Sequence, residues 1–151
     1  MNAIKVGLAA VLMISVGLFV AKINEGDATE VVMHKSANCE CCSKWGAHMK
    51  DNGFTVVEKT HDNMSEIKRT LGMPEKLASC HTGVIGGYLI EGHVPAADVQ
   101  RLLKERPDII GLTAPGMPMN SPGMQKKGQE PKGYDVLALN KDGTTSIYAH
   151  Y

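Results

Sequence analysis

Three of the four cysteines of this chain lie within one short run, Cys39-Glu40-Cys41-Cys42. Thiolates have two main chemistries in proteins: they bind soft metal ions such as Cu(I), and they attack disulfides. Disulfide exchange needs two sulfurs, and a third beside them offers the mixed disulfide a wrong partner, whereas a metal site gains a ligand. The run therefore favours a copper site. Thiol–disulfide exchange by Cys39 and Cys42, which have C-x-x-C spacing, is the alternative.

The fourth cysteine, Cys80, lies in the run 78–82, which contains no proline. In a thioredoxin-like fold this position, just before the third strand, carries a proline that faces the reactive cysteines. We therefore expect Cys80 to face the other three cysteines, and the four sulfurs to hold one copper ion or to bridge several. Zinc fits less well, because Cys80 and His81 are adjacent rather than spaced as a zinc-binding pair. The alternative role for Cys80 is that of a small buried hydrophobe.

Two histidines are predicted to join this site as ligands or close neighbours. His34 ends the first expected strand and is within reach of the cysteine run, and His81 adjoins Cys80. Imidazole nitrogen is a common copper ligand, so both residues suit the same metal as the thiolates. His93 is a further candidate that the predicted ligand set leaves out.

Three methionines, Met117, Met119 and Met124, lie in a stretch rich in proline and glycine. Thioether sulfur is a weak ligand that suits Cu(I). We therefore predict these methionines as additional copper ligands. The alternative is that their apolar side chains pin the stretch to the core.

The elements that must position these residues follow from hydrophobic periodicity and turn signals. The expected strands cover residues 30–34, 54–58, 82–85, 88–90, 134–139 and 144–148, and the expected helices cover residues 41–52, 63–71 and 95–105. Ser36 or Asn38 is expected to cap the first helix, and Asn63 or Ser65 the second. Residues 108–133 are expected to form a long functional loop.

This order predicts an α/β fold: a thioredoxin-like mixed sheet with flanking helices, plus a C-terminal β-hairpin. The fold places its reactive cysteines where the first strand leads into the first helix, which is the position of the run 39–42. The zero net charge and the few aromatic residues give no reason to expect nucleic acid as a partner.

The N-terminal segment, residues 1–28, is predicted to be an export signal or a membrane anchor. Lys5 and Lys22 flank an uncharged apolar run that is long for a signal peptide and short for a membrane span, which needs ~20 residues. We expect residues 29–151 to form a single copper-binding domain in the periplasm, in contact with the membrane only if the segment is retained. In this oxidising compartment, a disulfide-stapled module without metal is a further alternative.

Several motifs resemble those of the CopG-type copper-resistance proteins, a family of unknown function encoded near copper-export genes in bacteria. The motifs are the runs 33–36, 39–45, 77–82, 91–96, 116–119 and 121–124. The resemblance implies a periplasmic, thioredoxin-like protein that binds copper through Cys39, Cys41, Cys42 and Cys80, as a single ion or a multinuclear cluster. It also implies a redox role on copper, which leaves open whether the protein is an enzyme.

The function predicted from sequence is therefore the capture of Cu(I) in copper tolerance. The partners expected for such a protein are copper ions and, as the recipient of the metal, a copper exporter or a periplasmic copper chaperone.

Overall fold

The computed structural model describes residues 29–126 and 128–151. The predicted export signal or anchor, residues 1–28, lies outside the described residues. Within them, no helix combines the length and the apolar character needed to cross a membrane.

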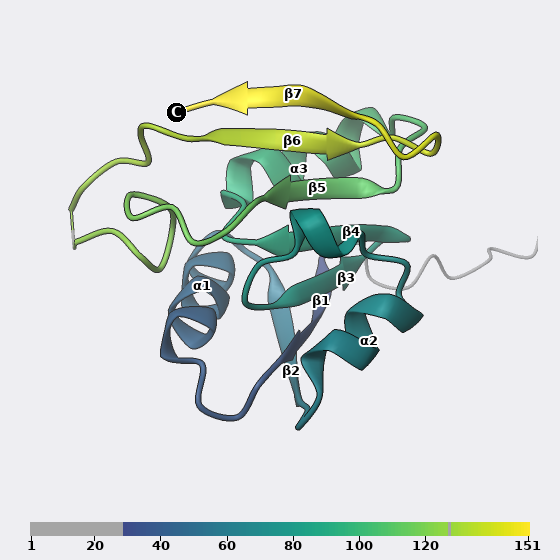
Figure 1. Cartoon of the computed structure of the whole chain (residues 1–151). Coiled ribbons are helices and arrows are strands. Elements are labelled where there is room, and N and C mark those ends of the chain that lie inside the picture. The colour runs from purple at the N-terminus through teal and green to yellow at the C-terminus, as the bar shows by residue number, and fades with distance from the viewer. Residues whose placement is uncertain (1–28, 127) are drawn as a thin grey trace, which may run out of the picture.

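The described residues form a mixed α/β fold (Figure 1). The elements in chain order are β1 (Glu30–Lys35), α1 (Glu40–Asp51), β2 (Thr55–Thr60), α2 (Met64–Thr70), a short 3-10 helix η1 (Glu75–Leu77), β3 (Thr82–Ile85), β4 (Tyr88–Gly92), α3 (Ala96–Glu105), β5 (Gly111–Ala114), β6 (Asp135–Leu139) and β7 (Thr145–His150). In this part of the chain seven strands form one sheet, in the order β2-β1-β3-β4-β5-β6-β7. The predicted mixed sheet with flanking helices and a C-terminal hairpin is confirmed.

The first four strands have the connectivity expected of a thioredoxin-like domain. β1 pairs with β2 in parallel and with β3 in antiparallel orientation, and β3 forms a hairpin with β4. The Gly86-Gly87 turn joins the hairpin strands, and both glycines have the positive φ that such a turn requires. β1 therefore lies inside the sheet, and its carboxyl end leads directly into the cysteine run.

Helices cover both faces of these four strands. On one face, α1 and α3 lie side by side: the backbone N–H of Ala96 donates to His48 Nε2 at 3.1 Å, and Gln100 Nε2 donates to the carbonyl of Asn52 at 3.0 Å. On the other face, Lys68 of α2 donates to Thr82 Oγ1 of β3 at 2.9 Å. Because successive residues of a strand point to opposite faces, the residues around β3 can be assigned to the α1 face or the α2 face.

The prediction of an unbroken loop over residues 108–133 is wrong at one point, because Gly111–Ala114 forms β5. This strand pairs in parallel with β4 and in antiparallel orientation with β6, and its residues are buried. Gly111 is required there, since a Cβ atom would lie 1.9 Å from the carbonyl oxygen of Leu89. A strand of four residues that starts with glycine has too little periodicity to be seen in the sequence.

The C-terminal end of the chain is fixed to α3 by a cluster of tyrosines. Tyr151 stacks on Tyr134, with ring centroids 5.2 Å apart, and its hydroxyl donates to Asp98 Oδ2 at 2.8 Å. Burial raises the pKa of Asp98, so its carboxylate depends on such donors to stay charged. By contrast, the Tyr148 hydroxyl is buried without a hydrogen-bond partner in the described part of the chain.

We predict that Tyr151→Phe lowers the free energy of unfolding by about 1–2 kcal/mol, because it leaves a buried carboxylate oxygen without its donor. Tyr148→Phe is the matched control: it removes an unpaired hydroxyl of the same size and should change stability little. Urea unfolding of the two variants measures the difference. Equal losses in both would show that the hydrogen bond to Asp98 contributes nothing.

Candidate metal centre

The cysteine run lies at the turn from β1 into α1. Cys39 is the N-cap residue of α1, and Cys41 and Cys42 lie in its first turn. The cap makes no side-chain hydrogen bond, so the prediction that Ser36 or Asn38 caps this helix is wrong. In α2 the predicted cap Asn63 is confirmed, since its side chain accepts from the Glu66 N–H at 3.2 Å.

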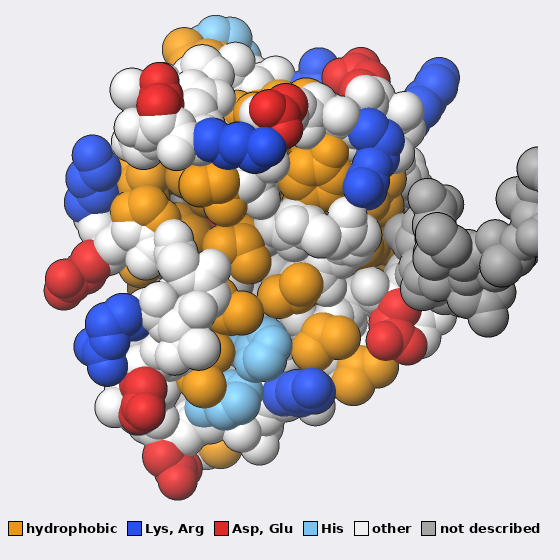
Figure 2. Space-filling model, turned by 90° about the vertical axis from the view of Figure 1, so that its right-hand side faces the viewer, with side chains coloured by type: hydrophobic (Ala, Val, Ile, Leu, Met, Phe, Trp, Pro, Cys, Tyr) orange, Lys and Arg blue, Asp and Glu red, His pale blue; other side chains and the backbone are white. Residues whose placement is uncertain are grey.

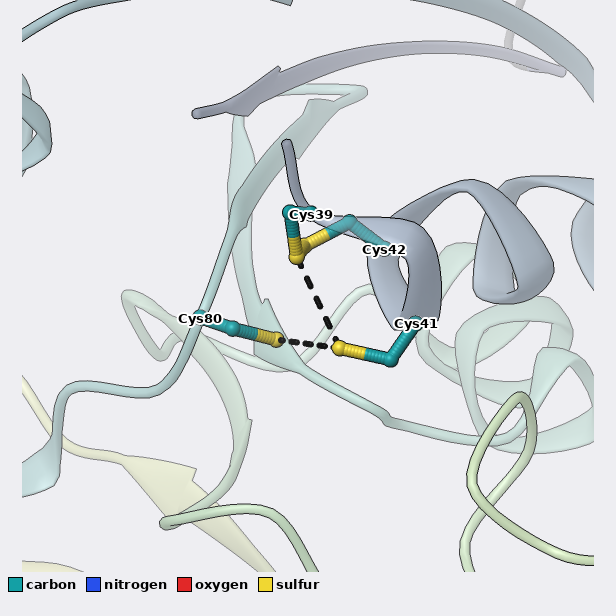
Figure 3. Close-up of side chains that lie close together, drawn as sticks. All are labelled: Cys39, Cys41, Cys42 and Cys80. Atoms are coloured by element: carbon teal, nitrogen blue, oxygen red, sulfur yellow. Dashed lines mark hydrogen bonds between the residues drawn. A yellow bond between two sulfur atoms is a disulfide. The ribbon is translucent and has the colours of Figure 1, made fainter. Parts of the chain in front are cut away.

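The structure brings all four cysteine sulfurs together. Cys39 and Cys42 form a disulfide with their Cα atoms 5.3 Å apart, and Cys41 and Cys80 are free thiols. Cys41 Sγ lies 3.5 Å from Cys39 Sγ and 3.9 Å from Cys80 Sγ. Figure 3 shows Cys80 pointing from its own segment toward the three cysteines at the end of α1. The four sulfurs lie within 4.8 Å of one another, a spacing that allows them to share a metal ion.

Cys80 also belongs to a second group of donors, with His81 and His93. Its sulfur lies 3.4 Å from His81 Nδ1 and 3.0 Å from His93 Nε2. His93 Nδ1 lies 2.7 Å from the carbonyl of Pro122. Because a carbonyl can only accept, Nδ1 carries the proton and Nε2 presents its lone pair to the sulfur. A histidine that binds a metal through one ring nitrogen typically donates a hydrogen bond from the other nitrogen to a carbonyl or carboxylate.

The two histidines are neutral at physiological pH. Both are fully buried, and this burial lowers the pKa of His81 and of His93. The His81 ring packs against Trp45 at 4.4 Å between centroids, and its Nε2 has no hydrogen-bond partner within the described residues. The nitrogen of this ring that faces Cys80 is Nδ1, so an ion shared with the Cys80 sulfur would bind there and would leave Nε2 unpaired.

The thiol of Cys80 is strongly perturbed. Burial, together with the neighbouring Cys41, raises the pKa of Cys80 to about 12. In the metal-free protein Cys80 is therefore protonated at neutral pH. A bound cation supplies the missing opposite charge and displaces the proton, so metal binding at this site is coupled to proton release.

His93 is the residue that sequence reasoning left out. The signal that could have found it is the register of the β3–β4 hairpin, in which Ile85 lies opposite Tyr88 and Thr82 opposite Glu91. Continuing this register by two residues places Cys80 opposite His93. The two-residue turn can be predicted from the sequence, so the position of Cys80 opposite His93 could have been predicted as well.

The structure does not bring His34 together with the cysteines. His34 lies opposite Thr82 across β1 and β3, and Thr82 contacts Lys68, so His34 belongs to the α2 face. Its Nδ1 lies 2.9 Å from His61 Nε2, with the ring centroids 5.0 Å apart. Histidine side chains are visible side by side at the surface in Figure 2. His34 therefore lies on the opposite side of the sheet from Cys41, whose helix covers the other face.

The stretch that carries the three methionines crosses the cysteine site. At one end, the Ser79 hydroxyl donates to the carbonyl of Gly116. At the other end, Gly123 has a φ of +87° and packs so closely on α1 that a Cβ atom would lie 2.8 Å from Trp45 N and 3.0 Å from the Cys41 carbonyl oxygen. Only glycine fits there, so the loop is held against the cysteine run at its base.

The three methionines of this stretch differ in exposure. Met117 and Met119 are 54% and 71% exposed, whereas Met124 is half-buried. The alternative in which apolar packing explains all three methionines therefore fails for Met117 and Met119. Their thioethers are available to solvent beside a fixed loop, and in the described part of the chain no hydrogen bond joins them to the four cysteine sulfurs.

Comparisons with known proteins give a consistent picture. A family described as "Protein of unknown function, DUF411" matches residues 77–124, which include Cys80, His81 and His93. The comparison with curated proteins gave no match. Two solved structures are similar over most of the chain, and their titles are "Copper resistance protein copG- Form 1" and "Copper resistance protein copG- Form 2".

The first is 43% identical with a TM-score of 0.75, and the match covers 83% of this chain and 98% of that one. The second is 44% identical with a TM-score of 0.74, and the match covers 81% of this chain and 97% of that one. An identity of this size over nearly the whole of the solved chains indicates common descent as well as a common fold. The chain therefore belongs to the CopG family of copper resistance proteins.

Proposed function

We propose that the protein captures copper as Cu(I) in the periplasm and so contributes to copper tolerance. The observation that carries the proposal is the convergence of Cys80 with the three cysteines at the start of α1, all four sulfurs lying within 4.8 Å. Soft thiolates prefer Cu(I) among the common biological ions. The titles of the two similar structures, which name copper resistance, support the same metal.

The reduced form of the chain is the form that binds Cu(I) in this proposal. With the Cys39–Cys42 disulfide intact, only Cys41 and Cys80 are available as thiols. Reduction of this disulfide by an external dithiol, which gives up two electrons and two protons and becomes a disulfide itself, supplies the other two. A single Cu(I) ion is satisfied by two or three thiolates, and each thiolate can bridge, so four sulfurs at this spacing suit a cluster of several copper ions. His81 and His93 add nitrogen donors at the Cys80 side.

The proposal also covers the location of the protein and the transfer of the metal. Residues 1–28 would carry the protein out of the cytoplasm or tether it to the membrane. The exposed thioethers of Met117 and Met119 would offer weak Cu(I) ligands at the rim of the site. Weak outer ligands suit an ion that is passed on, here to a copper exporter or a periplasmic copper chaperone.

Anaerobic titration of the reduced protein with Cu(I), against a competing chelator, tests the proposal. We expect at least one tightly bound equivalent, and we expect Cys80→Ser or the double change Cys39→Ser/Cys42→Ser to weaken binding by about tenfold or more, which is ~1.4 kcal/mol. Ser43→Ala is a control on the same helix that removes no sulfur. Absence of tight binding, or equal affinity in the cysteine variants, would overturn the proposal.

A second prediction concerns the methionine loop. Replacing Met117, Met119 and Met124 together by Leu should weaken copper loading by a few-fold and leave the unfolding temperature unchanged, because Leu keeps the apolar surface but has no thioether. Copper affinity and thermal unfolding are measured on the same sample. Unchanged affinity and stoichiometry would exclude the methionines as ligands.

The Cys39–Cys42 disulfide favours a second candidate function, thiol–disulfide exchange. In that reaction a substrate thiolate attacks Cys39 Sγ, the bond to Cys42 breaks, and Cys42 leaves as a thiolate. A shallow surface pocket beside Cys39, lined in part by Lys35 and Lys44, gives such a substrate access. Cys41 and Cys80 have no role in this reaction.

Cys41→Ser separates the two functions. If copper capture is the function, this variant loses Cu(I) affinity and neither it nor the wild type turns over in a disulfide-reductase assay. Sustained turnover by both proteins, with unchanged copper affinity, would favour the oxidoreductase instead. Cys42→Ser is the negative control of the reductase assay, because it removes one sulfur of the disulfide that exchange requires.

A further inference from the structure

A buried polar network lies behind Cys80, on the α2 side of the sheet. At its centre is Glu91 of β4, which has no exposed surface. Glu91 Oε1 lies 2.5 Å from Lys68 Nζ, and Glu91 Oε2 accepts from Thr82 Oγ1 at 2.6 Å. Lys68 also donates to Thr82 Oγ1 at 2.9 Å, so the three side chains form a closed set.

The same carboxylate also contacts the backbone of a residue outside the sheet. The backbone N–H of Ser79 donates to Glu91 Oε1 at 2.6 Å. Ser79 and Thr82 lie on either side of Cys80 and His81, so Glu91 holds the donor-bearing segment at both ends. The pairing of β3 with β4 explains the contact with Thr82, but it does not explain the contact with Ser79, which precedes the strand.

The neighbouring backbone is shaped to admit this contact. Gly92 has a φ of +71°, and a Cβ atom there would lie 2.5 Å from Ser79 Oγ. Any other residue at Gly92 would push the Ser79 segment away from β4. The Ser79 hydroxyl in turn donates to Gly116 O, which links the network to the methionine loop.

Stability alone does not account for a buried ion pair. Removing two charges from water is expensive, and replacing such a pair by apolar residues of similar size is often neutral or stabilising. The network is therefore better explained by what it holds in place. In the thioredoxin-like fold a proline occupies the position of Cys80 and restrains the chain, and the run 78–82 contains none.

We propose that Glu91, paired with Lys68, is the positioning residue of the metal centre: its carboxylate fixes the Ser79–Thr82 segment so that Cys80 and His81 face the other donors. Glu91 itself touches no metal ligand atom in this scheme and acts through the Ser79 N–H. The inference rests on the proposed function only for its copper readout, since the placement of the Cys80 sulfur can be measured without metal.

A matched pair of double variants tests the proposal. Lys68→Met/Glu91→Gln removes both charges but keeps an amide oxygen that can accept from the Ser79 N–H. Lys68→Met/Glu91→Leu removes the same charges and the acceptor as well. Neither variant leaves an unpaired buried charge. Only the Gln variant keeps an acceptor for the Ser79 N–H, so a comparison of the two tests this hydrogen bond.

Two quantities are compared in full-length protein. The first is the rate at which iodoacetamide alkylates Cys80 in the metal-free disulfide form, followed by mass spectrometry. The second is Cu(I) affinity after reduction. We expect the Leu variant to react at least about threefold faster at Cys80, because the segment opens more often. We expect the Leu variant to bind Cu(I) at least about tenfold more weakly, because residues that orient metal ligands contribute this much to metal affinity. The Gln variant should bind Cu(I) with an affinity close to that of the wild type.

Equal alkylation rates in the Leu and Gln variants would overturn the proposal, whether or not copper binds. Failure of the wild type to bind Cu(I) would overturn the proposed function and leave the alkylation result to decide the role of Glu91. If the Leu variant does not fold, Ser79→Pro replaces it, because it deletes the N–H itself and Ala78 already has a backbone conformation that proline tolerates in the preceding residue. Ser79→Ala is its control, and equal Cys80 reactivity in these two would also overturn the proposal.

Discussion

Antiparallel pairing of β3 with β1 is the constraint on which the candidate metal centre depends. β1 ends at Lys35, just before the cysteine run, and β3 begins at Thr82, just after Cys80 and His81. In an antiparallel pair the carboxyl end of one strand lies beside the amino end of the other, so sulfurs from distant parts of the chain meet at one end of the sheet. The β3–β4 hairpin adds His93 by the same logic. A slip of one residue in this register would turn His81 away from Trp45 and toward the α2 face.

Burial gives this group of donors its chemical character. It raises the pKa of Cys80 and lowers the pKa of His81 and His93, so all three are neutral when no metal is bound. A group of neutral donors shielded from water does not attract cations at long range. It favours an ion that brings its own charge, sheds its hydration shell readily and forms strong bonds to sulfur, as the proposed Cu(I) does.

Much of the fold and part of the site could be predicted from the sequence. The strand and helix periods, the Gly86-Gly87 turn and the place of Cys80 before a strand were sufficient for the first four strands and for the meeting of the four sulfurs. β5 could not be predicted, because four residues that begin with glycine leave no periodic pattern. His34 lies away from the cysteines for a different reason. The sequence shows that His34 ends a strand, but it does not show which face of the sheet the side chain occupies. Glu91 was invisible as a site residue, because a single acidic residue in an apolar strand has no partner until the fold supplies Lys68 and Ser79.

The addition of β5 to the sheet has a consequence for the electrostatics of the whole domain. A sheet that stopped at β4 would expose that strand as an edge, with water and unpaired backbone groups beside Glu91. Because β5 pairs along Leu89–Gly92, every residue of β4 is buried instead. The C-terminal strands thus give the Lys68–Glu91 pair an interior of low dielectric constant, in which one hydrogen bond can hold a backbone segment firmly. A domain reduced to its first four strands would keep the four sulfurs in its sequence and lose the dry surroundings of the Lys68–Glu91 pair.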